Sequence, residues 1–531
     1  MIDASAASPQ KLRGGYYTDP VVARWLRRWA LGAGGKTLLE PSCGDGAFLD
    51  DLPDNVVLTA IERDPVEAER ARARAPSGAT VHTADALELL DQWSHEGRRF
   101  DAVVGNPPYI RYQYLSGASQ DKAAALIVSA GLKFTRHTNA WVPFVVGSLG
   151  LLKPGGRLAM VIPSELLHVL HAGAARHALL GLCSRVHVLD PSELWFADTL
   201  QGVVLLLAER GEGDPSPCRL GVERVRDRSA LDCAAEQRIV ECDADTVLPG
   251  PGKWTRAMLS PSVRGLLRTL ETDPRTRRFT DVAKVQVGVV TGANAFFLVD
   301  QSTVDAHGLA SCVRPMFGRS SHVRGVIYSA QDHEDNRQMG LPCWFVDMPD
   351  ADALEDGHRR WLAAGEAQDL PQRYKCRIRS PWWRVPSVFP APVGLLKRSH
   401  DLPRLVDNRL GALSTDTAYR VFPQDGVDSD VLVSLFLNPL TALSAELEGR
   451  HYGGGVLELV PSEIRGLRLP WADTAPDLDA LDRAWRGGTP AEDVLNTHGR
   501  AVLERSGLGD AADALLAGWR ELRARRQRSD T

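Results

Sequence analysis

The stretch TLLEPSCGDGAFL at residues 37–49 decides the fold of the first part of this chain. It joins a short apolar run to a turn that holds Gly44 and Gly46, and glycine permits both a tight turn and a close approach of the backbone to a ligand. A helix is expected to start just behind this turn. Position 49 is Leu where a dinucleotide-binding motif has a third glycine, and no Gly-Lys-Ser/Thr sequence follows for a phosphate loop. The turn therefore suits a nucleoside cofactor without a pyrophosphate, although on its own it could equally be structural.

Outward from this turn, short apolar runs alternate with helical patterns between residues 36 and 208. Helices are predicted over 66–75 and 142–152. Strands are predicted at 37–40, 56–62, 100–106, 157–163, 185–190 and 202–209, and a further strand is predicted to end at Asp85 within VHTADAL (81–87). Strands that are apolar almost throughout and are separated by helices are typical of a doubly wound α/β sheet, so we predict a Rossmann-like domain here.

Polar residues follow three of these strands at their carboxyl ends. Glu62 can accept hydrogen bonds from ribose hydroxyls, and Asp85 can accept one from the exocyclic amine of an adenine ring. The sequence Asn-Pro-Pro-Tyr at 106–109 comes after the fourth strand, and its two prolines hold the backbone extended. The Asn106 side-chain oxygen and the Pro107 carbonyl can then face one amino group, with the Tyr109 ring available for stacking. This order of groups predicts a site rather than a chance series of turns.

The second half of the chain has a different pattern. Polar breaks containing Gly and Pro occur at 209–217 and 248–253, and from there to about 470 the sequence is irregular and rich in proline. This indicates an α+β module of short strands. Helical periodicity returns at 491–528 and ends in a basic run, expected to be a solvated helix end. We therefore predict domains at 1–247, 248–485 and 486–531.

Composition excludes several classes of protein. The 531 residues are 44% hydrophobic and 24% charged, which is ordinary for a globular chain and excludes a mainly disordered, collagenous or coiled-coil one. No run approaches 18 apolar residues, and the first 11 residues do not resemble a signal peptide. The eight cysteines are scattered without a C-x-x-C pair, so neither a disulfide framework nor a structural metal is expected. The expected location is the cytoplasm.

The first 245 or so residues resemble S-adenosylmethionine-dependent methyltransferases that act on amino groups, more narrowly the γ-class adenine-N6 DNA methyltransferases of the TaqI type. GGYYTDPVVARWL (14–26), the glycine turn, the two carboxylates, Asn-Pro-Pro-Tyr and LLKPGGRLAMVIPSELL (151–167) occur in that family's order. The resemblance implies a class I methyltransferase fold, S-adenosylmethionine as cofactor and no metal. It implies catalytic roles for Asn106, Pro107 and Tyr109, and cofactor contacts for Thr18, Glu40, Gly44, Gly46, Glu62, Asp85 and Ala86. Ala86 stands where the family often has an aromatic residue.

The resemblance extends to the C-terminal half, where phrases at 287–298, 381–386, 405–423 and 449–464 are similar to the family's target recognition domain. It implies double-stranded DNA as the partner. Residues 371–410 hold nine Lys or Arg against two Asp, a local charge of +7 in a chain of −5, and this stretch is expected to lie against the DNA backbone unless it is simply a solvated face. Its predicted contacts are Arg373, Lys375, Arg377, Arg379 and Arg384. Trp382 and Trp383 are either core residues or groove contacts.

The mechanism implied is methylation of adenine N6 after the base is flipped out of the duplex. Asn106 and Pro107 would accept hydrogen bonds from the reacting amine, and Tyr109 would stack on the base. The family's second stacking position falls at or near Ala172, which cannot stack; His168 and His171 are the nearest planar side chains and are expected to be exposed on a helix. Cys43 is expected to be a packing residue.

The implied role is a monomeric modification enzyme of a restriction-modification or phage-defence system, acting alone or beside a separate nuclease. One alternative is an amino-group methyltransferase that acts on RNA or on a protein glutamine amide. Another is a non-enzymatic DNA-recognition subunit, against which the intact motifs argue. No nuclease signature is present in the sequence.

Overall fold

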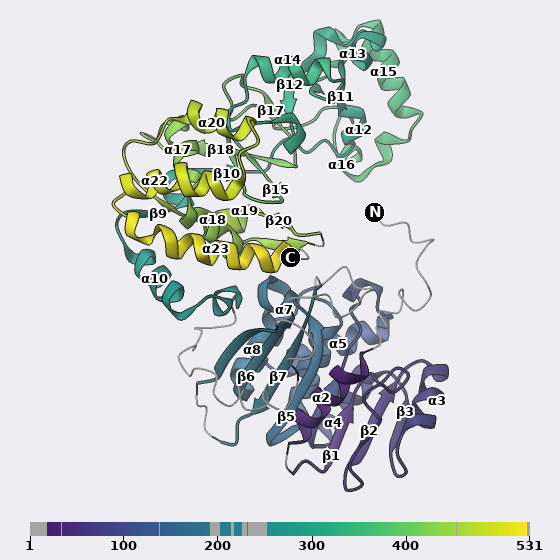
Figure 1. The fold of residues 1–531 in the computed structure, drawn as a ribbon. Coiled ribbons are helices and arrows are strands. Elements are labelled where there is room, and N and C mark those ends of the chain that lie inside the picture. The colour runs from purple at the N-terminus through teal and green to yellow at the C-terminus, as the bar shows by residue number, and fades with distance from the viewer. Residues whose placement is uncertain are drawn as a thin grey trace. The chain divides into compact units, whose positions relative to one another are not determined.

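The structure, a computed structural model, describes residues 18–32, 34–136, 138–191, 202–213, 217–225, 231, 252–452 and 454–527. The chain divides into two compact units, which meet between Leu259 and Ser260. Figure 1 colours the first unit purple to blue and the second teal to yellow. The domain boundary predicted near residue 247 lies outside the described residues.

The first unit is built on an eight-stranded sheet with the order β3-β2-β1-β4-β5-β7-β6-β8 (Figure 1). Strands β1 to β5 run parallel to one another, and β7 runs antiparallel to both β5 and β6. The strands are β1 Thr37–Glu40, β2 Val57–Glu62, β3 Thr80–Thr83, β4 Phe100–Gly105, β5 Leu152–Pro163, β6 Cys183–Pro191, β7 Val203–Arg210 and β8 Arg219–Val225. This confirms the predicted α/β sheet.

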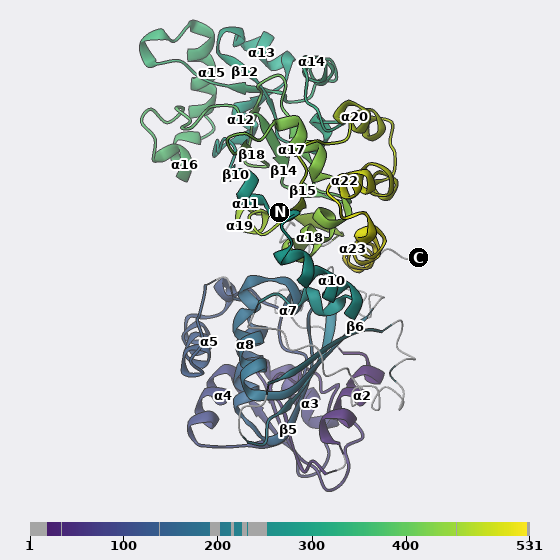
Figure 2. The ribbon, with the colours of Figure 1, turned by 90° about the vertical axis from the view of Figure 1, so that its left-hand side faces the viewer.

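Helices cover both faces of this sheet. In Figure 2, α4, α5 and α8 lie on one side and α2 on the other. Alternate residues of the central strands, such as Leu38, Ala102 and Val161, share a buried apolar cluster with the apolar face of α2. The helices are α2 Pro20–Leu31, α3 Pro65–Arg74, α4 Ala86–His95, α5 Gly117–Ser129, α6 Trp141–Gly150, α7 Glu165–His168 and α8 Gly173–Leu182.

The helix predicted behind the glycine turn does not form. Residues 44–49 are turns, and the next helix along the chain is α3. The guanidinium of Arg27 on α2 donates to the carbonyls of Phe48 (3.1 Å) and Asp51 (3.3 Å). Phe48 is buried in the core, and Asp51 has a left-handed φ of 52°. The contacts with Arg27 and the burial of Phe48 hold this segment in successive turns, so tertiary contacts override the local helical pattern.

The second unit is α+β, as predicted, with short strands in several small sheets. One four-stranded sheet, β10-β18-β14-β16, is antiparallel throughout, and another has the order β11-β13-β12-β17. The strands are β9 Thr276–Arg278, β10 Ala283–Gln286, β11 Leu298–Val299, β12 Val313–Phe317, β13 Trp344–Val346, β14 Val393–Leu396, β15 Arg398–Ser399, β16 Leu405–Asp407, β17 Leu413–Ser414, β18 Ala418–Pro423, β19 Arg450–Tyr452, β20 Val456–Glu458 and β21 Arg468–Pro470.

Helices pack around these small sheets. They are α10 Pro261–Thr272, α11 Phe279–Val282, α12 Asn294–Phe297, α13 Gln301–His307, α14 Ala330–Gln338, α15 Asp356–Glu366, α16 Tyr374–Arg377, α17 Ser429–Phe436, α18 Pro439–Glu448, α19 Pro461–Ile464, α20 Leu478–Arg486, α21 Ala491–Val494, α22 Arg500–Arg505 and α23 Ala512–Gln527. The helices after residue 486 belong to this unit: α23 packs on α18, and Arg526 pairs with Glu446 (2.7 Å), both side chains being fully buried.

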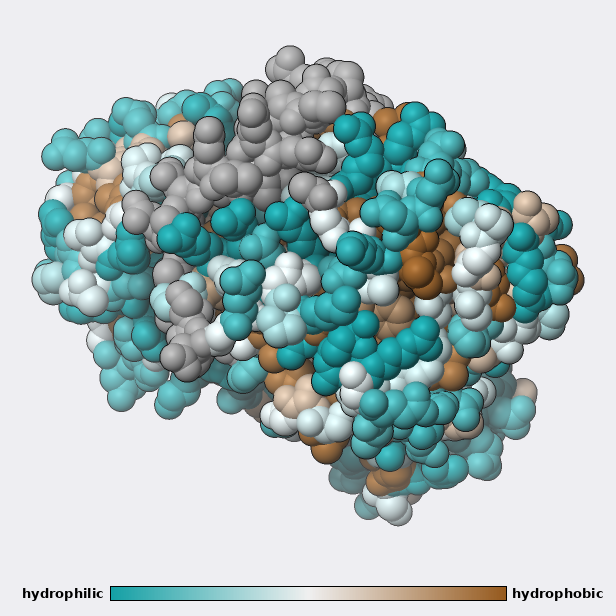
Figure 3. Space-filling model, turned by 90° about the horizontal axis from the view of Figure 1, so that it is seen from below, coloured by the Kyte–Doolittle hydropathy of each residue, from teal (hydrophilic) through white to brown (hydrophobic). Residues whose placement is uncertain are grey.

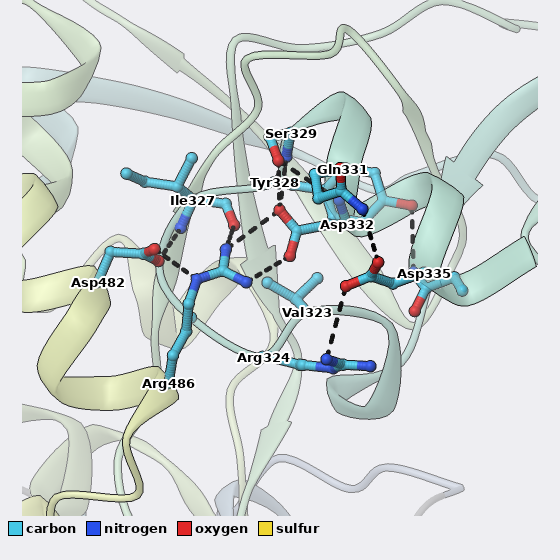
Figure 4. A network of polar contacts seen from close by, with 12 residues as sticks. Val323, Arg324, Ile327, Tyr328, Ser329, Gln331, Asp332, Asp335, Asp482 and Arg486 are labelled. Carbon is cyan, nitrogen blue, oxygen red and sulfur yellow. Dashed lines mark hydrogen bonds and ion pairs between the residues drawn. The ribbon is translucent and has the colours of Figure 1, made fainter. Parts of the chain in front are cut away.

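A polar network joins α20 and α14 to the loop that holds Val326 and Ile327 (Figure 4). Arg486 pairs with Asp482 (2.5 Å) and Asp332 (2.6 Å), and it donates to the Ile327 carbonyl (2.9 Å). Asp482 in turn accepts from the backbone N–H of Val326 (2.8 Å) and of Ile327 (3.0 Å). Distant segments of the sequence are therefore held together by charge-assisted hydrogen bonds.

Two observations describe the surface. In the described part of the chain, no single helix is long and apolar enough to cross a membrane; α17 and α18 together reach that length and composition, but they are bent by 76° and mostly buried. On the face shown in Figure 3, hydrophilic side chains predominate and hydrophobic ones form small, separate patches. Scattered patches of this kind are ordinary on a water-exposed surface.

Candidate active site

The glycine turn lies at the carboxyl end of β1 and is tied to the end of β2. Gly44 and Gly46 have φ values of 53° and 92°, which favour glycine. The Cys43 N–H donates to the Ile61 carbonyl (2.9 Å). The Glu62 carboxylate accepts from the N–H of Gly44 (2.9 Å) and of Asp64 (2.7 Å). Glu62 is thus oriented by two backbone donors and keeps acceptor capacity for a further ligand.

At Gly44 the turn leaves open space. A Cβ at Gly44 would meet nothing within 4 Å, whereas one at Gly46 would lie 3.0 Å from a Leu49 methyl and 3.3 Å from the Ala71 Cα. Packing against α3 and a positive φ therefore favour glycine at position 46. At position 44 the positive φ favours glycine, and the open surroundings leave room for a ligand. These are the properties expected of a turn that a ligand approaches closely.

Glu40, the last residue of β1, is a buried carboxylate whose Oε2 has no hydrogen-bond partner among the described residues. Burial, together with the nearby charge of Glu62, raises the pKa of Glu40 well above its ordinary range, and Arg27 opposes this. A buried acid of this kind is costly unless a cation or donor completes it. The ammonium and sulfonium groups of S-adenosylmethionine are cations of the required sign, so the residues present fit this cofactor.

Asp85 and Ala86 begin α4 after β3. Asp85 Oδ1 caps the helix by accepting from the Leu87 N–H (2.9 Å), and Oδ2 accepts from the Ser119 hydroxyl of α5 (2.5 Å). Ala86 is buried at the first turn. The contact between Ser119 and Asp85 is one that the sequence did not indicate, because the two residues are 34 positions apart. Its effect is to fix the carboxylate, whose oxygens still have unused acceptor positions.

Asn106 follows β4, and its side-chain amide is held at both ends. Its Nδ2 donates to the Thr18 hydroxyl (3.2 Å), and its Oδ1 accepts from the Tyr109 hydroxyl (2.7 Å). The Tyr109 hydroxyl also lies 3.1 Å from the Val161 carbonyl of β5, and Ser42 donates to the Asn106 carbonyl (3.3 Å). The orientation of the amide is therefore determined by its neighbours.

The segment after β5 holds the position that matches the family's second stacking residue, and its histidines differ from the sequence expectation. His168 is buried rather than exposed, and His171 is half-buried, 3.6 Å from the Glu165 carboxylate. Burial alone would raise the pKa of Glu165, but the hydrogen bond and charge of His171 hold it below its usual value. Ala172 is fully buried. His168 belongs to the short helix α7, in which Leu166 and Leu167 are also buried.

Cys43 has the surroundings of a packing residue. It is 4% exposed and belongs to the main apolar cluster of the first unit. Burial and the charges of Glu40 and Glu62 raise the pKa of its thiol. Such a thiol stays protonated at neutral pH and is a poor nucleophile.

The five basic residues predicted to contact DNA lie in the second unit and have different surroundings. Arg373, Lys375 and Arg377 are exposed, on and next to α16. Arg379 instead donates to the carbonyls of Thr291 and Val290 (both 2.7 Å), and burial lowers its pKa. Arg384 pairs with Asp350. Only the first three present their charge fully to solvent.

The rest of the basic stretch is engaged within the protein. Lys397 and Arg398 both pair with Glu458, Arg404 donates to the Gly325 carbonyl (2.7 Å), and Arg409 pairs with Asp407. Trp382 and Trp383 pack on an apolar cluster of the second unit, as expected of core residues. Most of the basic side chains behind the local charge of +7 therefore stabilise the fold. The sequence alone could not distinguish these cations from the three exposed ones.

Comparison with known proteins matches both halves of the chain. Residues 63–186 match the family described as Eco57I restriction-modification methylase, and residues 251–503 match the C-terminal domain of the Type II methyltransferase M.Eco57I.

Two relatives cover nearly the whole chain. The Type II methyltransferase M.AccI of Acinetobacter calcoaceticus is 21% identical over 91% of this chain and 88% of its own length. M.PaeR7I of Pseudomonas aeruginosa is 23% identical over 93% of this chain and 87% of its own length. Among solved structures, the DrdV–DNA complex is similar over 93% of this chain and 58% of that one, at 11% identity and a TM-score of 0.47.

Proposed function

Since this chain belongs to the Type II restriction-modification DNA methyltransferases of the Eco57I kind and uses S-adenosylmethionine, we propose that it methylates the N6 amine of adenine in duplex DNA. The observation that carries this proposal is the Asn106 amide, which Thr18 and Tyr109 hold in one orientation at the carboxyl end of β4. The oxygen of such an amide is suited to accept a hydrogen bond from an exocyclic amino group. Glu40, Gly44, Gly46, Glu62, Asp85 and Ala86 are proposed to hold the cofactor.

The chemistry that the chain must supply is activation of a weak nucleophile. The lone pair of adenine N6 is delocalised into the ring. Hydrogen bonds from that amine to Asn106 Oδ1 and to the Pro107 carbonyl would favour tetrahedral geometry and localise the lone pair on nitrogen. When bound, S-adenosylmethionine supplies an electrophilic methyl group. The residues contribute positioning and preorganised polarity, and the amine proton can leave after transfer without a strong base.

The target base must leave the double helix, because its N6 atom is inaccessible within the stack. Tyr109 is proposed to stack on the flipped adenine. Its hydroxyl is bonded to Asn106, so the ring and the amide are positioned together. We propose that Tyr109 supplies most of the stacking, since the matching second position is the buried Ala172.

Recognition is proposed to belong to the second unit, and catalysis to the first. Arg373, Lys375 and Arg377 are proposed to contact DNA phosphates, whereas Arg379 and Arg384 would act by holding the segment in place. In this view the protein binds DNA as a monomer, works at the host nucleoid and protects sites from a separate restriction or defence nuclease.

Methyl transfer with tritiated cofactor, followed by nucleoside analysis of the product DNA, tests the proposal. We expect the label in N6-methyladenine. Label in N4-methylcytosine would overturn the adenine assignment, and label confined to RNA or to a glutamine amide would overturn DNA as the substrate. Sequencing of methylated host DNA would then give the recognition site and the strand pattern.

A further inference from the structure

One turn of the second unit exposes apolar and basic side chains together. We call it the α16 surface, and it consists of Arg373, Tyr374, Lys375, Arg377 and Ile378. Tyr374 is 65% exposed and Ile378 is 61% exposed. The two are four residues apart on one helical turn and therefore lie on the same face of it. Together with the flanking basic residues they form a small exposed patch that is apolar at its centre.

The α16 surface is held in place by contacts with the rest of the second unit. Cys376, on the opposite face of the turn, is fully buried in an apolar cluster of this unit. The Arg379 guanidinium, just after the turn, donates to the carbonyls of Val290 and Thr291. A Cβ at Gly292 would lie 2.6 Å from the Lys375 Cβ, so that only glycine lets the two segments approach so closely. The exposed pair is therefore presented by packed structure, which lowers the entropy cost of binding.

The cations of this surface differ from the others in the basic stretch. In the described part of the chain, Arg373, Lys375 and Arg377 form no ion pair, and the one contact of their charged ends is that of Lys375 Nζ, 5.7 Å from the centre of the Tyr374 ring. The other six cations between residues 371 and 410 bond to carboxylates or to backbone carbonyls. A protein of net charge −5 thus keeps three uncompensated positive charges around an exposed apolar pair.

We propose that the α16 surface binds duplex DNA, with Tyr374 and Ile378 entering a groove and the three cations contacting the phosphates on either side. This inference rests on the proposed function and deepens it. Charge complementarity selects a polyanion. An apolar ridge between cations fits a groove flanked by phosphates, and apolar wedges that contact base steps are an established way of engaging a groove.

The first test uses the charges. Fluorescence anisotropy with a labelled duplex of random sequence measures affinity as a function of salt, and it needs no methyl transfer. The variant Arg373→Gln/Lys375→Gln/Arg377→Gln should flatten the slope of log K against log salt by roughly one unit for each phosphate that is no longer neutralised, up to about three. The matched control is Arg268→Gln/Arg359→Gln/Arg360→Gln, which removes three exposed arginines of the same unit and should leave the slope unchanged.

The second test uses the apolar pair. Tyr374→Ala/Ile378→Ala should lower affinity about tenfold while leaving the salt slope intact, because it removes stacking and groove contact but no charge. Tyr452→Ala, which removes another exposed tyrosine of this unit, should leave affinity nearly unchanged. Unchanged thermal melting of both Ala variants would show that the effect is one of binding.

The outcomes separate this inference from the proposed function. If the charge variant keeps the wild-type slope, or if it binds anionic lipid vesicles less well but DNA equally well, the α16 surface is not a DNA contact, and adenine methylation is unaffected by that result. If the slopes change as expected but no N6-methyladenine is formed, the surface stands and the assignment of the reaction fails.

Discussion

At the scale of single residues, the candidate active site is a set of polar groups that are each oriented by a neighbour far away in the sequence. Asn106 depends on Thr18 and Tyr109, Glu62 on the Gly44 N–H, and Asp85 on Ser119. Preorganisation of this kind matters because polar groups that are already aligned need not reorganise during reaction.

Asn106→Ala should reduce turnover by about 10²–10³, since one preorganised acceptor for the reacting amine is removed. Binding of cofactor and DNA should stay nearly intact. Single-turnover methylation with separate measurement of both dissociation constants checks this. A rate within about threefold of wild type, far short of the expected decrease, would exclude Asn106 as the acceptor.

Thr18→Val should lower the rate of methylation, because Asn106 Nδ2 loses the hydroxyl to which it donates and the side-chain amide can rotate out of its orientation. Thr18→Ser keeps a hydroxyl and should restore most of the rate. The informative readout is the division between kcat and the cofactor dissociation constant: loss of orientation alone lowers kcat, whereas an equal loss in cofactor affinity would mean that Thr18 acts on the cofactor rather than on Asn106.

Glu40→Gln should stabilise the protein without cofactor and weaken cofactor binding. The buried carboxylate disfavours folding at neutral pH because its pKa is raised by burial, and a neutral amide avoids this cost. The amide cannot complement a cationic ligand equally well. Thermal melting with and without S-adenosylmethionine should therefore give a higher melting temperature for the free variant and a smaller shift on ligand addition. A lower melting temperature for the free variant would contradict this account of Glu40.

At the scale of elements, the sequence predicted the central strands of the first unit well because each is a nearly continuous apolar run. It did not predict β8, whose sequence RLGVERV mixes charged and apolar residues. The prediction of a helix after Gly46 failed, because contacts with Arg27 of another helix hold that segment in turns. The sequence also wrongly placed His168 at the surface. The sheet and the groups at its carboxyl edge could thus be predicted from the sequence. Contacts such as that between Thr18 and Asn106, 88 positions apart, could not, because no local sequence pattern indicates them.

Within the basic stretch at 371–410, the sequence could not distinguish buried from exposed arginines. A matched pair of variants tests this difference. Arg379→Ala should lower the free energy of unfolding by about 1–2 kcal/mol, because two backbone carbonyls lose their donors. Arg377→Ala, two residues away and exposed, should change it by less than about 0.5 kcal/mol. Urea denaturation measures both, and amide hydrogen exchange should rise over residues 287–294 only in Arg379→Ala. Equal effects would mean that Arg379 does not support this segment.

At the scale of the whole molecule, the second unit joins many short elements, and the network around Arg486 is one of the connections between them (Figure 4). Burial alone would raise the pKa of Asp332, but its bonds to Arg486 and Ser329 hold it below the ordinary value. An acid with a depressed pKa stabilises the fold above its unfolded pKa, about 3.9, and this contribution is lost as pH falls through the lower, folded pKa.

Arg486→Gln should therefore destabilise the protein by about 2 kcal/mol at neutral pH, less than for a fully buried pair because Arg486 is 30% exposed. The difference from wild type should shrink as pH falls below about 4. Arg483→Gln on the same helix is the control, since its pair with Asp477 is mostly exposed and should contribute almost nothing at any pH. Urea denaturation across this pH range is the measurement, and a difference that does not vary with pH would remove Asp332 from the explanation.

The packing of α23 on α18 has a consequence for how such chains can be recombined. The first helix of the second unit, α10, also packs against α23, so the two ends of this unit are in contact. A graft that takes only part of it would separate Arg526 from Glu446 and leave a buried charge alone, at a cost of about 3–5 kcal/mol. A graft that takes everything after Leu259 keeps the pair intact through one crossover. Chimeras, in the laboratory or in evolution, should therefore inherit this unit whole.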